Sequence, residues 1–165
     1  MDFICLNKSD EKAIGDMSAL ASAIVKEHFD PIIGSRQNDY MIEKFQSVKS
    51  IKQQLSEGYV YYFICLDDTA IGFLAYRLDE DCLYLSKFYL DKEYRGRGFS
   101  KEMLSFVKSA AIENGLKRIR LNVNKNNNAI YAYEKLGFKR TGTQKKDIGN
   151  GFFMDDYIYE YSDIR

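Results

Sequence analysis

Several residue types are scarce in this 165-residue chain, and each scarcity excludes a class of function. The only histidine is His28, and no two cysteines are spaced as a CxxC pair, so the ligand spacings of zinc sites are missing. A Ser-His-Asp triad would have to use this one histidine, which has no nucleophile motif beside it. We therefore expect neither a metal centre nor triad chemistry.

Cysteine, long apolar runs and net charge are also limited. Cys5, Cys65 and Cys82 lie far apart in apolar surroundings, which predicts buried, reduced thiols in a cytoplasmic protein. No window approaches the roughly 18–20 apolar residues that span a bilayer, and no basic leader is evident. Lysine plus arginine and aspartate plus glutamate number 24 each, without the basic excess of a nucleic-acid-binding protein. We expect no membrane and no nucleic-acid partner.

The sequence does contain a regular succession of apolar patterns. One proline, no low-complexity linker and no internal repeat predict a single domain over residues 1–165. Period-2 and period-3.6 patterns predict strands at 2–6, 59–66, 70–78, 82–90, 117–124, 138–142 and 152–161, and helices at 16–29, 38–58, about 99–114 and 126–137. The order β-α-α-β-β-β-α-β-α-β-β predicts an α/β fold, with a mixed central sheet of about seven strands flanked by four helices.

The segment YRGRGFSK, residues 94–101, alternates glycine with arginine directly after an apolar strand. A helix that begins here can bind an anion, because its first turn has unpaired N–H groups and the positive end of the helix dipole. Gly96 and Gly98 would let a phosphate approach those amides, and the cations of the segment add charge. A P-loop does not fit, and neither does GxGxxG, whose third glycine position is Lys101.

A second motif, on the next strand-helix unit, identifies the phosphate ligand. Residues 126–138 resemble NxxAxxxYEKxGF, and residues 95–100 resemble [RQ]xxGx[GA], with Ser100 where glycine or alanine is usual. With these two motifs and the strand order over essentially the whole chain, the sequence resembles the GNAT superfamily of acyl-CoA-dependent acetyltransferases. The resemblance implies a single-domain GNAT-like fold and an N-acetyltransferase that uses acetyl-CoA as cosubstrate, without a metal.

The resemblance also implies roles for the matching residues. The third strand of the meander would offer backbone groups to the pantetheine arm at Phe88, Tyr89 and Leu90. Backbone amides would hold the pyrophosphate along Arg95, Gly96, Arg97, Gly98, Phe99, Ser100 and Lys101. Asn126 would sit at the cap of the helix flanking the pantetheine, and Tyr133 matches the tyrosine that is directed at the thioester sulfur.

In such enzymes the amine attacks the acetyl thioester directly, so the leaving thiolate needs a proton. Tyr133 suits this task because a phenol with a pKa near 10 stays protonated at neutral pH. It could equally be a core aromatic, since it shares a helical face with Ala129 and Leu136. An alkylamine costs roughly 4.6 kcal/mol to deprotonate at pH 7, so a base is expected. Candidates are Glu93, which could also be a solvated charge, and a carboxylate of MDDY, residues 154–157.

The acceptor is the least constrained part of the reaction. The resemblance implies that residues 29–41 and 147–160 would line its site, where Asp155, Asp156 and several tyrosines suit a cationic amine. We expect the primary amine of a small molecule, polyamine-like or amino-acid-derived. A protein acceptor (a ribosomal-protein N-terminus or a lysine) stays open, and so does a non-catalytic acyl-CoA-binding module. A homodimer is implied by resemblance only.

Overall fold

The computed structural model describes residues 1–165, which form two compact units. One unit comprises residues 1–77 and 86–97, and the other comprises residues 78–85 and 98–165. Strand β4 (Leu83–Leu90) contributes residues to both units. The strands are hydrogen-bonded in the order β1-β2-β3-β4-β5-β7-β6 in one mixed seven-stranded sheet, which confirms the expected α/β fold class.

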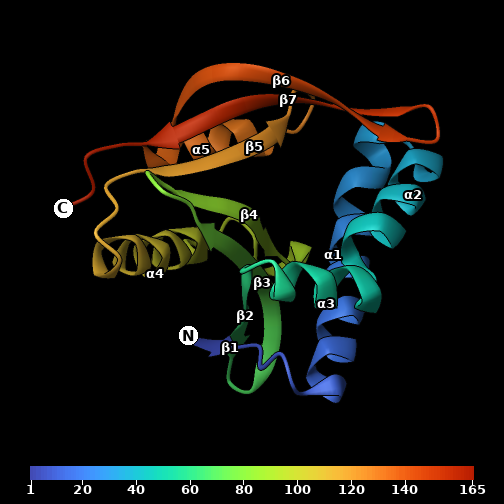
Figure 1. Ribbon diagram of the computed structural model, residues 1–165, viewed down its shortest axis with the longest axis horizontal. Helices are drawn as coiled ribbons and strands as arrows, with labels where there is room; N and C mark the ends of the chain where they lie inside the picture. The colour runs from blue at the N-terminus through green and yellow to red at the C-terminus, as the bar shows by residue number, and fades with distance from the viewer. The chain divides into compact units, whose positions relative to one another are not determined.

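The first unit combines antiparallel strands with three helices (Figure 1). Its strands include β1 (Asp2–Cys5), β2 (Val60–Leu66) and β3 (Thr69–Leu78). Strand β2 pairs antiparallel with both β1 and β3. The helices are α1 (Glu11–Ile33), α2 (Ser35–Gln46) and α3 (Val48–Ser56), followed later by the 3-10 turn η1 (Lys92–Tyr94). Fully buried side chains of α1, α3, β2 and β3 form its core, among them Ile14, Met17, Ile51, Tyr61 and Phe73.

The expected helix over 38–58 is wrong, because the structure divides this segment into α2 and α3 at Ser47. Ser47 has extended backbone angles (φ −68°, ψ 158°), and its hydroxyl accepts a hydrogen bond from the Ser50 amide at 3.2 Å. A serine that caps a new helix competes with continuation of the old one. The apolar period runs on through the break, so periodicity alone did not reveal it.

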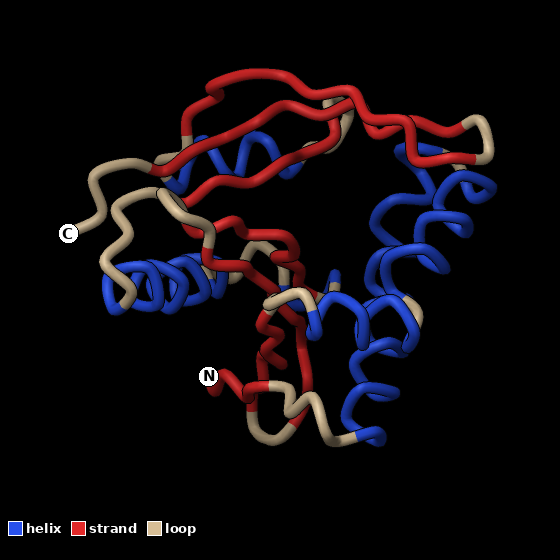
Figure 2. Tube along the Cα trace, viewed as in Figure 1, coloured by secondary structure: helices blue, strands red, loops and turns tan.

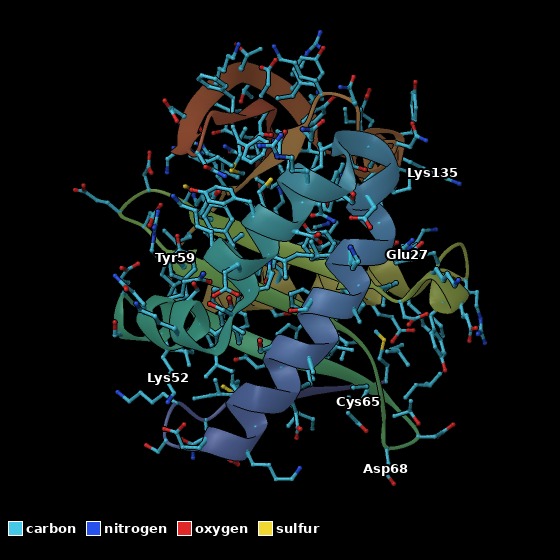
Figure 3. All side chains as sticks on the ribbon, turned by 90° about the vertical axis from the view of Figure 1, so that its right-hand side faces the viewer. Glu27, Lys52, Tyr59, Cys65, Asp68 and Lys135 are labelled. Atoms are coloured by element: carbon cyan, nitrogen blue, oxygen red, sulfur yellow. The ribbon has the colours of Figure 1, made fainter.

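Helix α1 is longer than expected at both ends. It starts one residue after Asp10, whose carboxylate accepts a hydrogen bond from the Ala13 amide at 3.0 Å, and it continues through Pro31. The prediction of three buried thiols holds only for Cys82: Cys5 is exposed and Cys65, labelled in Figure 3, is half-buried. All three cysteines are free thiols.

The second unit contains the remaining strands and two helices. They are α4 (Phe99–Glu113), β5 (Ile119–Asn124), α5 (Ala129–Leu136), β6 (Lys139–Gly149) and β7 (Phe152–Tyr161). Strands β4 and β5 are parallel, whereas β7 pairs antiparallel with β5 and with β6. Figure 1 shows α5 lying along β5 and β7, and Figure 2 traces β6 and β7 as one long hairpin. Its turn at Asn150 and Gly151 has φ values of 54° and 78°, as a tight hairpin turn requires.

Candidate functional site

The end of β4 carries Phe88, Tyr89 and Leu90, and β3 approaches it closely at Gly72. A Cβ atom on Gly72 would lie 2.3 Å from the Tyr89 carbonyl oxygen, so only glycine fits there. The amide of Asp91 donates to the carbonyl of Ile71 at 2.8 Å. Because successive N–H groups of a strand point to opposite edges, the Leu90 amide points away from β3.

Arg95 lies in the turn after β4, and its side chain also contacts two other segments. Its Nε donates to the Leu90 carbonyl at 3.0 Å, and its Nη2 forms a 2.8 Å ion pair with Glu27 of α1, labelled in Figure 3. The guanidinium therefore fixes the end of β4 to α1, and its electrostatic charge is already balanced by a carboxylate. Arg97 lies over the ring of Tyr94 at 5.4 Å. No sequence pattern pointed to Glu27.

The two glycines of the turn have backbone conformations that favour glycine. Gly96 has a φ of 71° and Gly98 has a φ of 87°, and a Cβ atom at either position would meet nothing within 4 Å. Conformation, rather than lack of space, requires glycine at both positions. Helix α4 begins about where it was expected; Gly98 is its N-cap, and the helix has no side-chain cap. Phe99, Ser100 and Lys101 form the first turn, whose N–H groups suit an anion.

Tyr133 lies on α5 as predicted and is half-buried. Its ring packs edge-on against Phe138 at 5.7 Å between centroids, and Phe138 packs in the same way against Tyr161 at 5.6 Å. Burial raises the pKa of the Tyr133 phenol well above its usual value of 10.0. The group therefore stays protonated at neutral pH and can serve only as a proton donor or as a core aromatic.

The helix cap that was expected at Asn126 does not form there, because the N-cap residue of α5 is Asn128, which makes no side-chain cap hydrogen bond. The Asn127 side-chain oxygen accepts a hydrogen bond from the Ala129 amide at 2.9 Å, and Asn127 is buried. Asn126 is exposed, and its amide donates to the Asn124 side chain at 2.9 Å. A run of three asparagines offers three possible caps, and the sequence alone did not distinguish them.

The carboxylates considered as a base differ in their surroundings. Glu93 lies on η1 and is exposed. Asp155 forms a 3.0 Å ion pair with Lys125. Asp156 is buried, and desolvation together with the nearby Asp155 raises the pKa of its carboxyl to about 6. Asp156 therefore occupies an environment that favours the neutral form of its carboxyl.

The tyrosines of the last hairpin were expected to offer aromatic faces to a cation. At Tyr157 this prediction is wrong, because two cations of the chain already occupy the ring. The guanidinium of Arg140 lies 4.4 Å from its centroid, and the ammonium of Lys125 lies 5.5 Å away. Cation–π contacts within about 6 Å are favourable, so the ring of Tyr157 interacts with cations of its own chain.

Lys87 of β4 was missed by the sequence reasoning. It is 6% exposed, and its Nζ donates to the Phe45 carbonyl at 2.9 Å, to the Gln46 side chain at 2.8 Å and to the Tyr61 hydroxyl at 2.5 Å. Burial lowers the pKa of Lys87 to about 7. The alternation of LYLSKFYL could have revealed it, since Leu83, Leu85 and Lys87 fall on one face.

The fold and both motifs agree with a protein family. Residues 23–138 match the acetyltransferase (GNAT) family, and the chain belongs to this family. It is an acyl-CoA-dependent N-acetyltransferase, and its cosubstrate is acetyl-CoA. No group of three or more histidine, cysteine, aspartate or glutamate side chains is arranged to hold a metal ion. No helix has both the length and the apolar character to cross a membrane.

Particular relatives share most of the chain. A probable spermine N(1)-acetyltransferase of Bacillus subtilis subsp. natto is 28% identical over 138 residues, which cover 76% of this chain and 91% of the relative. A spermine/spermidine N(1)-acetyltransferase of Bacillus subtilis strain 168 matches to the same extent. The structure of PaiA N-acetyltransferase from Thermoplasma acidophilum in complex with coenzyme A superposes with a TM-score of 0.75, at 17% identity over 98% of this chain and 99% of that one.

Proposed function

We propose that this enzyme acetylates a primary amine of a small polycationic or amino-acid-derived molecule, with a polyamine as the leading acceptor class. The observation that carries the proposal is the similarity to two spermine acetyltransferases of Bacillus subtilis along 91% of their length. An L-ornithine N5-acetyltransferase of Arabidopsis thaliana, 27% identical over 110 residues, also acts on an alkylamine. The chain spans about half of that plant protein, 46% of its length.

We propose that acetyl-CoA binds along β4 and the turn that follows it. The residues would be Phe88, Tyr89 and Leu90 for the pantetheine, and Arg95, Gly96, Arg97, Gly98, Phe99, Ser100 and Lys101 for the pyrophosphate, with Asn126 and Tyr133 from the second motif. The uncapped start of α4 supports this placement, because its amides are oriented for an anion. The family match includes residues of both compact units, which favours one acetyltransferase domain over residues 1–165.

The proposed mechanism is direct attack of the amine on the acetyl thioester. The carbon–nitrogen bond forms first and places negative charge on the carbonyl oxygen; the carbon–sulfur bond breaks as this oxyanion collapses, and the amine gives its proton to a base. The Leu90 amide, which points away from β3, is the candidate donor to the developing oxyanion. Tyr133 would protonate the leaving thiolate. Glu93 stays the predicted base. It is exposed, and a buried carboxylate would be more favourable in this role.

A mass-spectrometric assay over an amine panel tests the function. The panel contains spermidine, spermine, ornithine, and a peptide with a free N-terminus and an internal lysine. We expect acetylated spermidine or spermine and release of free coenzyme A. Acetylation of the peptide alone would replace the small-molecule acceptor with a protein acceptor. Binding of acetyl-CoA without release over the whole panel would instead indicate a non-catalytic module.

The proposal also covers the location and the oligomeric state of the enzyme. The three free thiols suit the reducing cytoplasm, where we place the reaction. A homodimer stays a prediction, which the sedimentation velocity of the purified chain tests.

A further inference from the structure

One face of the second unit collects polar side chains around Asp156. The register places Asn124 of β5 and Gln144 of β6 on either side of Asp156 in β7. Residues directly opposite one another across a pair of strands project from the same face. The Asn122 side chain, two positions before Asn124, donates to the Gln144 side-chain oxygen at 2.6 Å. Three carboxamides therefore surround one carboxyl.

The charged neighbours of Asp156 are already paired with one another. Asp155 forms its ion pair with Lys125, and Glu160 forms a 2.8 Å ion pair with Arg120. Asp156 itself is buried, with 5% of its surface exposed, and yet it forms no ion pair. A buried carboxylate without a counter-ion is unfavourable unless something neutralises it. This local cost is the kind of strain that is found at binding sites.

The surrounding groups are suited to a compact cation. An ammonium group has three N–H donors and no acceptor, so it needs three oxygens. Asp156 offers carboxylate oxygens, and the carboxamides of Gln144 and Asn124 offer further oxygens beside it. The Asn124 oxygen is held by the Asn126 amide, which donates to it at 2.9 Å. The subsite therefore combines fixed hydrogen-bond acceptor oxygens with the negative charge that an ammonium group requires.

The opposite face of the same strands is already covered. The Tyr159 hydroxyl donates to Glu134 of α5 at 3.2 Å, so α5 lies on the face away from Asp156. Tyr133 belongs to α5. An acceptor held by Asp156 would thus lie on the face of β7 opposite the helix that carries the candidate proton donor.

We propose that Asp156, with the carboxamides of Asn122, Asn124 and Gln144, forms a subsite that binds an alkylammonium group of the acceptor. This inference rests on the proposed function and specifies its substrate class: amines that carry a positive charge. Asp156, Gln144 and Asn124 contact the substrate through their oxygens, and Asn122 positions the Gln144 oxygen.

The pH dependence of the subsite follows from its neighbours. Burial and Asp155 raise the pKa of Asp156 to about 6, whereas Asn122 and Lys125 act to lower it. From β6, Lys145 lies opposite Asp155 in the register. The carboxylate form predominates above pH 6, so ammonium binding is expected to weaken as the pH falls through that value.

The test compares Asp156→Asn with Asp155→Asn, the adjacent carboxylate that is half-buried and paired with Lys125. Asparagine keeps the size of the side chain and removes the charge. Both variants are assayed as the full chain with spermidine and acetyl-CoA, and spermidine binding is measured by calorimetry with coenzyme A present. We expect Asp156→Asn to weaken spermidine binding and raise its KM at least tenfold, since a charge-assisted hydrogen bond contributes that much. The KM for acetyl-CoA should stay within twofold.

The control separates a binding role from a structural one. Asp155→Asn should change the KM for spermidine less than threefold, and the native pH dependence between 5 and 7 should disappear only in Asp156→Asn. The melting temperature of Asp156→Asn should be equal to or above the native value, because a buried charge without an ion-pair partner is removed. Equal spermidine affinity in Asp156→Asn and the native chain would overturn the subsite. If no amine of the panel is acetylated, the proposed function fails, while the calorimetric comparison still decides on the subsite.

Discussion

The Lys87 ammonium donates a 2.8 Å hydrogen bond to the Gln46 side-chain oxygen inside the first unit. Gln46 is the last residue of α2, where backbone carbonyls lack partners within the helix and the helix dipole is negative. Lys87 also reaches the Phe45 carbonyl there, so one strand residue caps the end of a helix. The buried lysine thus holds α2 onto β4, three residues before the proposed oxyanion donor Leu90.

Replacing Lys87 with methionine tests this cap. The variant leaves Gln46 and Tyr61 oxygens without their donor in the interior, so the free energy of unfolding at pH 9 should fall by about 2 kcal/mol. Lys92→Met is the control, because Lys92 is an exposed residue of η1, and it should change stability by less than 0.5 kcal/mol, as is roughly usual at surface positions. Urea denaturation measures both. Equal stability of the two variants would contradict the cap.

The same lysine predicts a pH dependence of stability. Its folded pKa of about 7 lies below the usual value of 10.5, so between these values the unfolded chain binds one more proton than the folded chain. Stability from this group is therefore complete above pH 10.5 and is lost as the pH falls towards 7. We expect the native chain to gain stability over Lys87→Met between pH 7 and 9.5, with a limiting slope of roughly 1.4 kcal/mol per pH unit. A pH-independent difference would show that Lys87 keeps its charge throughout.

Gly72→Ala tests the close approach of β3 to β4. The new Cβ atom would lie 2.3 Å from a backbone oxygen, which no side-chain rotation relieves, so β4 must shift. We expect a loss of about 2–4 kcal/mol in stability, in the range of overpacked cores, and a rise in the KM for acetyl-CoA. Gly142→Ala in β6 is the matched control, since its nearest neighbour would be 3.7 Å away. Similar stability of the two variants would mean that β4 is not held by Gly72.

Much of the fold followed from the sequence because the patterns were local. Each strand of the β2–β4 meander was recognised from its own apolar run and the turn after it, and Gly98 was placed correctly at the start of α4. The two motifs identified the acetyltransferase family for the same reason. Such features depend on neighbours along the chain, which a single sequence displays.

The candidate site was less accessible to sequence reasoning because its contacts join distant residues. The ion pair of Arg95 with Glu27 and the bonds of Lys87 to Phe45 and Gln46 each span dozens of residues of chain. Asp155 and Asp156 looked equivalent in the sequence, and only the partner across the sheet and the burial separate them. Charge in a sequence does not reveal which charge is compensated.

Gly98→Ala tests the anion-binding turn. Alanine at a φ of 87° costs about 1–2 kcal/mol, and relief of that strain would reorient the first amides of α4. Gly115→Ala is a strict control, because Gly115 follows the other end of the same helix with a φ of 71° and equally open space. Both variants should lose similar stability in thermal denaturation. Only Gly98→Ala should raise the KM for acetyl-CoA, by at least fivefold; an equal KM in the two variants would remove this turn from cosubstrate binding.

Tyr133→Phe separates proton donation from packing. Phenylalanine keeps the ring that contacts Phe138 and removes the hydroxyl, whose raised pKa keeps it protonated across the working range. If the hydroxyl protonates the thiolate, kcat should fall about 100-fold, the lower range for general acid catalysis, while the KM for acetyl-CoA changes less than threefold. Steady-state kinetics with acetyl-CoA varied at a saturating amine concentration measures both quantities.

The control for this variant is Tyr131→Phe on the same helix. Tyr131 is 74% exposed, so loss of its hydroxyl should leave both kcat and stability unchanged. An acetyl donor whose leaving group needs no proton gives a second readout: with an acetyl thioester of a more acidic thiol, the rate deficit of Tyr133→Phe should shrink, because a more stable thiolate needs less help. A deficit that is independent of the thiol, or a kcat equal to that of Tyr131→Phe, would leave Tyr133 a core aromatic and assign the proton to another donor.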